Sequence, residues 1–171
     1  IALQTALLDL TTDKGTSQVR LCPSIRIYRK EDGKRRLSTP DEMQQTVASL
    51  KEAGFTAVRL ELAGALDDEM KARGECIPYR YPQEVLSHIG SLVSASKEAG
   101  GTEMDVVVAA NMNLSTDGMT YLALRCQRKG VSLFENPMAL RHQPEQGAAR
   151  REFSQIIGFG GDYHALEDFA Q

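Results

Sequence analysis

The sequence has few cysteines, no long apolar run and no strong excess of charge of one sign. Its three cysteines, Cys22, Cys76 and Cys126, are scattered and odd in number, which argues against a disulfide framework and favours a reducing, cytoplasmic location. No apolar run approaches the length of a membrane-spanning helix. The 20 basic and 23 acidic side chains give a net charge of −3. That balance provides no electrostatic reason to expect a nucleic acid or an anionic membrane as a partner.

Several motifs that would indicate a particular chemistry are also absent from the sequence. No Gly-rich phosphate-binding loop follows the first expected strand, and Gly158, Gly160 and Gly161 come too late to open a clear βαβ unit. A Rossmann-type nucleotide site is therefore only weakly indicated. No zinc-ligand spacing and no Ser/His/Asp or Cys/His pairing can be recognised.

Helix boundaries are clearly marked in the sequence. Lys-Glu-Ala-Gly occurs at 51–54 and again at 97–100, and Arg-Lys-Gly occupies 128–130. Each closes a helix-like stretch with basic residues and a glycine, which are helix stop signals, and each precedes an apolar run rich in β-branched residues. Thr39 and Glu42 are spaced as the N-cap and the capping-box partner of one helix.

The stretches between these signals predict helices that alternate with continuous apolar strands. Helices are expected at 1–10, 40–53, 83–99, 116–129 and near 145–154. Strands are expected at 25–29, 56–62, 105–110, 131–135 and 155–159, with an irregular insertion at 63–82. This alternation favours one α/β domain over residues 1–171, built on a parallel sheet covered by helices. Both a doubly wound sheet and a (β/α) barrel have this pattern.

Polar side chains stand where the expected strands stop. The strand at 56–62 carries Arg59 and Glu61, and the next three strands end at or run into Asn111, Glu135 and Asp162. From 109 to 135 is 26 residues and from 135 to 162 is 27, which is about one βα unit in each case. Because the carboxyl ends of parallel strands open on one face, these residues should be neighbours. Carboxylate and amide oxygens together predict a site for a hard cation such as Mg²⁺.

Simpler roles are also open for each of these residues. An acid at a strand end, such as Glu135 or Asp162, is equally compatible with a helix N-cap or a loop salt bridge. Arg59 is either an anion clamp for a substrate carboxylate or the ion-pair partner of Glu61 inside a barrel.

The strand ends resemble those of the enolase superfamily, in its mandelate racemase and acid-sugar dehydratase branch. The matching stretches are Val-Ala-Ala-Asn (108–111), Phe-Glu-Asn-Pro (134–137) and Gly-Gly-Asp (160–162). IALQTALLDL at the start resembles the helix that leads into the family's barrel, and GFTAVRLEL (54–62) resembles the strand that carries its paired lysine bases. The resemblance implies parallel (β/α) units of a TIM-type barrel. It also implies a Mg²⁺ ion that stabilises the enediolate of a carboxylate substrate.

The resemblance implies a degenerate metal site. Glu135 matches the second metal-binding acid, and Asp162 is a shortened version of the third. Ala109 replaces the first acid, so Mg²⁺ binding is expected to be weak or lost.

The resemblance also assigns candidate catalytic residues. Arg59 and Glu61 stand where the family has its two lysines, and the arginine resembles the mannonate dehydratase-like branch. Asn111 stands where that branch has a histidine acid.

Candidate substrate-binding residues lie outside the strands. In the mannonate dehydratase-like branch a tyrosine from the following loop works with the arginine, and Tyr79 and Tyr81 lie in the comparable insertion. His164, just beyond Asp162, is the histidine nearest to the expected rim.

The length of the chain leaves three hypotheses open. A complete (β/α)₈ barrel needs roughly 250 residues, whereas the 171 residues provide about five strands and no lid domain, and begin at Ile1 rather than Met. The chain is therefore a Mg²⁺-dependent dehydratase or racemase of a sugar acid, a catalytically silent scaffold, or a fragment of a longer enzyme. Open strand edges predict a homo-oligomer or completion by another chain, and an active site predicts a small carboxylate substrate.

Overall fold

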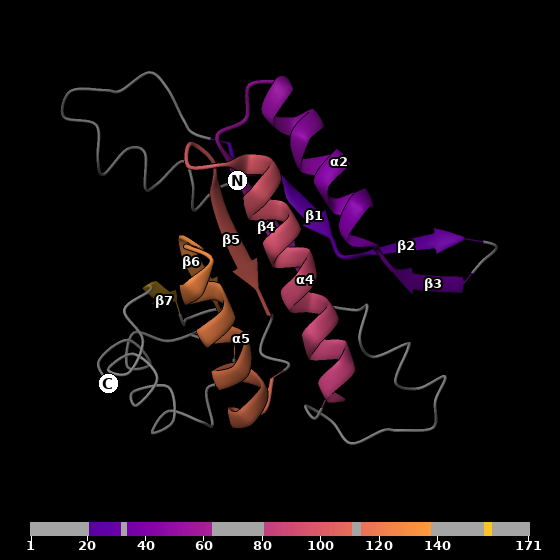
Figure 1. The fold of residues 1–171 in the computed structure, drawn as a ribbon, viewed down its shortest axis with the longest axis vertical. Coiled ribbons are helices and arrows are strands. Elements are labelled where there is room, and N and C mark those ends of the chain that lie inside the picture. The colour runs from indigo at the N-terminus through magenta and orange to yellow at the C-terminus, as the bar shows by residue number, and fades with distance from the viewer. Residues whose placement is uncertain (1–20, 32–33, 63–80, 111–113, 138–155, 159–171) are drawn as a thin grey trace, which may run out of the picture.

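The computed structural model describes residues 21–31, 34–62, 81–110, 114–137 and 156–158 (Figure 1). The helices expected at 1–10 and near 145–154 lie outside these residues. In chain order the described elements are β1 (Ser24–Arg26), β2 (Tyr28–Glu31), β3 (Lys34–Leu37), α2 (Pro40–Glu52), β4 (Ala57–Glu61), α4 (Gln83–Gly100), β5 (Asp105–Ala109), α5 (Thr116–Arg128), β6 (Leu133–Glu135) and β7 (Ile156–Gly158).

Five of the strands form one parallel sheet in the order β1-β4-β5-β6-β7. Neighbours in the sheet follow one another along the chain, without the reversal of strand order that marks a doubly wound sheet. This progression is that of (β/α) barrel units. The prediction of parallel TIM-type units with about five strands is therefore confirmed, and the sheet order excludes the doubly wound alternative for the described strands.

The helices form one layer over this sheet. Helix α4 packs against α2 on one side and α5 on the other, and it also contacts β5. Figure 1 shows the three helices side by side in front of the strands. A single helical layer outside parallel strands is the arrangement of a (β/α) barrel wall. None of the helices in the described ranges is both long and apolar enough to cross a bilayer.

Local signals fix the helix ends. The Thr39 hydroxyl accepts a hydrogen bond from the Glu42 N–H at 3.2 Å, and the Glu42 carboxylate accepts one from the Thr39 N–H at 2.8 Å. This capping box satisfies two backbone donors that the first turn of α2 leaves without helical partners, as predicted. Ser115 caps α5 through a backbone N–H of its first turn. Gly54 and Gly130, just beyond α2 and α5, have φ values of 89° and 67°, which glycine adopts without steric cost.

The expected single strand at 25–29 was wrong. Strand β1 ends at Arg26, and the chain then enters an antiparallel hairpin in which Tyr28 faces Leu37 and Glu31 faces Lys34. The register leaves Asp32-Gly33 between the two strands, and Asp-Gly is a strong sequence signal for a two-residue hairpin connection. The predicted strand ended at 29, and the prediction missed the hairpin signal that follows it.

The hydrophobic core lies between the sheet and the helices. Alternate strand residues enter it, because successive side chains of a strand point to opposite faces: Val58 and Leu60 from β4, Val106 and Val108 from β5, and Phe134 from β6, all fully buried. The residues between them, Arg59 and Glu61 on β4, therefore face the side of the sheet away from the helices. In a (β/α) barrel that side is the interior.

Candidate functional site

The carboxyl ends of the strands place two acids in one row. Register partners run from Glu61 on β4 to Ala109 on β5, to Glu135 on β6 and to Gly158 on β7. Partners in parallel strands point to the same face of a sheet, so Glu61 and Glu135 flank the methyl group of Ala109. The prediction that strand ends gather polar groups at one edge is confirmed for these residues.

Arg59 joins the two acids. Its Nε donates to Glu135 Oε2 at 2.7 Å, although 76 residues separate the two in sequence. Its Nη1 lies 3.5 Å from Glu61 Oε1 and donates to Ser24 Oγ at 3.4 Å. Arg59 does pair with Glu61, as one of its two expected roles required, but its shorter contact is with Glu135. Its role as an anion clamp stays a prediction.

The charge of Arg59 is held in place by these contacts. The hydrogen bond to Glu135 is the main cause that raises the Arg59 pKa above its already high ordinary value, and partial burial opposes it. The negative charges of Glu135 and Glu61 raise the Arg59 pKa further. Arg59 is therefore a permanent cation at this edge.

The backbone after β6 explains why Glu135 stands where it does. The Glu135 carbonyl accepts a hydrogen bond from the Ala110 N–H at 3.0 Å, which extends the ladder between β5 and β6 to the strand end. Asn136 then turns the chain with a φ of 45°, a left-handed conformation that asparagine tolerates better than most residues. The Pro137 carbonyl accepts from the Leu114 N–H at 3.1 Å, which ties this turn to the residues before α5. The sequence Phe-Glu-Asn-Pro thus ends the strand with its acid on the rim.

Several predicted site residues cannot be placed. Asn111, Tyr79, Asp162 and His164 lie outside the described residues, so their roles and the expected pairing of Asp162 with Glu135 stay predictions. Tyr81 immediately precedes the N-cap of α4, where it is half-buried and packs against the hydrophobic core.

The described residues do not fit a Mg²⁺ ion as they stand. Among them, no three His, Cys, Asp or Glu side chains are grouped so that they could hold a metal. The side chain of Ala109 offers no oxygen between the two acids, and Glu135 already accepts a hydrogen bond from the Arg59 guanidinium. A divalent ion on these acids would be repelled by that guanidinium.

Ser24 and Arg26 were missed by the sequence analysis. Ser24 lies beside Arg59 in the register of β1 and β4, and Arg26 lies beside Glu61. A period-two pattern was available, because Ser24 and Arg26 alternate with the apolar Ile25 and Ile27. The missing information was that β1 is the parallel neighbour of β4.

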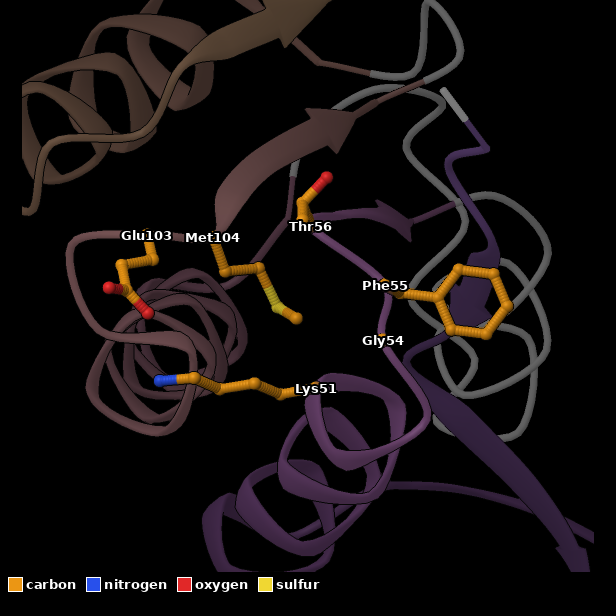
Figure 2. Close-up of a pocket in the computed structure, with 6 residues that line it drawn as sticks. All are labelled: Lys51, Gly54, Phe55, Thr56, Glu103 and Met104. Atoms are coloured by element: carbon orange, nitrogen blue, oxygen red, sulfur yellow. The ribbon is translucent and has the colours of Figure 1, made fainter. Parts of the chain in front are cut away.

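A pocket lies at the opposite edge of the sheet. Its cavity of about 190 Å³ is lined by residues that precede β4 and β5, together with the end of α2: Lys51, Gly54, Phe55, Thr56, Glu103 and Met104. Figure 2 shows Lys51, Glu103 and Met104 bordering the opening, whereas the Phe55 ring points away from it. Active sites of (β/α) barrels gather at the carboxyl ends of the strands, so this pocket is not the candidate site.

Solved structures with this fold are numerous. A protein from Bordetella bronchiseptica RB50, provisionally named a mandelate racemase, is 20% identical with a TM-score of 0.68 over 91% of this chain and 33% of its own. A provisionally named dehydratase from Salmonella enterica serovar Typhimurium is 17% identical, with a TM-score of 0.73 over 91% of this chain and 40% of its own. The 3,6-anhydro-D-galactonate cycloisomerase from Zobellia galactanivorans is 13% identical, with a TM-score of 0.56 over 83% and 32%.

These likenesses establish the fold. No protein-family model and no curated protein sequence matches the chain. The chain spans between 32% and 40% of the length of the three solved proteins. It therefore corresponds in fold to a part of each of these proteins.

Proposed function

We propose that this chain is an enolase-superfamily-like protein that binds the carboxylate of a sugar acid at the carboxyl ends of β4, β5 and β6. The observation that carries the proposal is the position of Arg59, a permanent cation on the rim with an acid on either side. One structural neighbour is named a 3,6-anhydro-D-galactonate cycloisomerase, which supports a sugar-acid substrate class, and another is named a dehydratase.

Arg59 is suited to anchor the substrate carboxylate. Its Nε contact with Glu135 is short, at 2.7 Å, and fixes the direction of the guanidinium plane. Its Nη1 contacts with Ser24 and Glu61 are long, at 3.4 and 3.5 Å, and therefore weak. A substrate carboxylate can replace them without breaking the pair that orients the arginine.

Glu61 is the described residue best placed to move a proton. It lies on the same strand as Arg59 and beside Ala109 in the register, and its side chain is 29% exposed. In a dehydration, Glu61 would take the proton from the carbon next to the substrate carboxylate and pass it to the hydroxide that leaves the neighbouring carbon, so that this group departs as water. The enol that remains would tautomerise in solvent to the keto form. The products are a 2-keto-3-deoxy acid and water, so atoms balance without an oxidant or reductant.

The test is a turnover screen of sugar acids, read by the appearance of the 2-keto-3-deoxy product. We expect Glu61→Gln to abolish turnover while substrate still binds, and Arg59→Gln to weaken binding at least tenfold. Arg36→Gln is the matched control, because it removes an arginine that pairs with Glu42 in the first turn of α2. No turnover and no binding of any sugar acid by the intact protein would refute the proposal and favour a catalytically silent relative.

A second part of the proposal concerns assembly. Strands β1 and β7 are the outer strands of the described five-stranded sheet, and an outer strand offers backbone groups to another chain. We propose that a second copy or another chain completes the barrel wall. Analytical ultracentrifugation of the intact protein tests this, and a monomer at micromolar concentration would contradict it.

A further inference from the structure

The geometry around Ala109 shows how one arginine reaches two acids. Glu61 and Glu135 lie on strands separated by β5, so they are about two strand spacings, or roughly 10 Å, apart. Between them the register places Ala109, whose side chain is a single methyl group. Arg59 lies two residues before Glu61 on β4 and beside Val107 of β5. Its guanidinium reaches across β5 to Glu135. A longer side chain at 109 would compete for that space.

The Arg59 guanidinium offsets one of the two negative charges of this cluster. Two carboxylates face one guanidinium, and all three groups are only partly exposed. Acids held together on a partly buried edge repel each other unless a cation lies between them. The Arg59 guanidinium contacts both acids, and as a side chain of β4 it is a permanent part of the protein.

We propose that the Arg59 guanidinium is the resident cation of this edge, so that neither the fold nor carboxylate binding here requires a divalent metal. The change from a metal to an arginine would need two features together: an arginine on β4 and a small residue at 109. Both are present. The inference goes beyond the proposed function, because it holds whether or not a sugar acid is turned over.

The experiment compares the intact protein with Arg59→Met, Ala109→Asp and the double variant Ala109→Asp/Arg59→Met. Each is titrated with Mg²⁺ up to about 10 mM while Tm is recorded, with Arg36→Met as the matched control. We expect the intact protein to respond no more than the control does. We expect Arg59→Met to gain about 2–5 °C from Mg²⁺ and the double variant to gain more, because the acids then need another cation.

Two outcomes would overturn the proposal. The first is a rise in Tm of the intact protein with Mg²⁺ that Glu135→Gln abolishes, because Glu135 would then be a metal ligand. The second is an Arg59→Met protein that is as stable as Arg36→Met and equally insensitive to Mg²⁺, because the edge would then need no cation.

A second readout needs only one variant, Glu135→Gln, which keeps nearly the shape of the original side chain. Mn²⁺ added to the intact protein and to Glu135→Gln, with water-proton relaxation as the readout, measures ion binding directly. Equal relaxation of the two proteins supports the proposal, and an enhancement that depends on Glu135 refutes it. This readout measures ion binding and no turnover. A result against the resident-cation proposal is therefore distinguishable from a result against the proposed function.

Discussion

The pair between Arg59 and Glu135 should be measurable as a coupling energy in a double-mutant cycle. The variants are Arg59→Met, Glu135→Gln and the two together, each of which keeps roughly the volume of the original side chain. Hydrogen bonds to charged groups contribute about 1.5–3 kcal/mol, whereas fully exposed ion pairs contribute about 0.2–1 kcal/mol. With side chains 23% and 30% exposed and a donor–acceptor distance of 2.7 Å, we expect a coupling of about 1–2 kcal/mol.

The two single variants should not be equivalent. Glu135→Gln leaves Arg59 next to Glu61, at 3.5 Å, and should cost about 1 kcal/mol. Arg59→Met leaves two carboxylates on the same edge without the guanidinium between them, and should cost about 2 kcal/mol or more. Because the pKa of Arg59 is raised in the folded protein, the stability that its charge contributes is complete below the ordinary arginine pKa. That stability is lost only at still higher pH. Raising the pH from neutral to about 9 should therefore not weaken the coupling.

The assay is urea unfolding of the four proteins at low and high salt, with the free energy of unfolding taken from midpoints at a common slope. The coupling should fall with added salt but persist, because the pair is partly buried. A cycle on Arg36 and Glu42 is the positive comparison; two hydrogen bonds of 2.9 and 2.7 Å join that pair, and we expect its coupling to be at least as large. A coupling below about 0.3 kcal/mol, or a larger cost for Glu135→Gln than for Arg59→Met, would refute the reasoning.

Three further predictions concern the rest of the described fold. Hydrogen bonds from Arg36 and the α2 cap hold the pKa of Glu42 at about 2. The stability that the Glu42 carboxylate contributes to the fold is therefore complete above the ordinary glutamate pKa and is lost as pH falls towards 2. Glu42→Gln should flatten the acid limb of the unfolding midpoint against pH. Phe134→Ala should lower the free energy of unfolding by about 3–5 kcal/mol in urea titrations, because this fully buried ring fills the core. Burial raises the pKa of Cys126 to about 12, so mass spectrometry after thiol labelling at pH 8 should find exposed Cys22 modified and Cys126 protected until unfolding.

The helices could be read from the sequence because their signals are local. The expected 40–53 and 116–129 differ by one residue from Pro40–Glu52 and Thr116–Arg128. The capping box of Thr39 and Glu42 lies within four residues, so no distant contact is needed to form it. The strands at 56–62 and 105–110 were also found, because each is a short stretch rich in apolar and β-branched residues that follows a helix stop signal.

The hairpin was missed because strand pairing is a relation between segments. Residues 25–29 are compatible with one continuous strand, and only their partners divide them: β1 pairs with β4, whereas β2 pairs with β3. Ile27, between the two strands, is fully buried and its carbonyl accepts from the Ser38 N–H at 2.8 Å. Burial at this point fixes where the barrel strand ends, and it depends on the whole packed core.

The sequence by itself determined that Arg59, Glu61 and Glu135 belong at the carboxyl ends of parallel strands, because strand periodicity and helix signals are written in short stretches. Only the tertiary structure decided which of them meet. Register alone places Ala109 between the two acids, and the 2.7 Å contact of Arg59 with Glu135 joins residues 76 positions apart across an intervening strand. Which side chains contact each other depends on their distances in the folded sheet, and those distances are set only when the sheet forms.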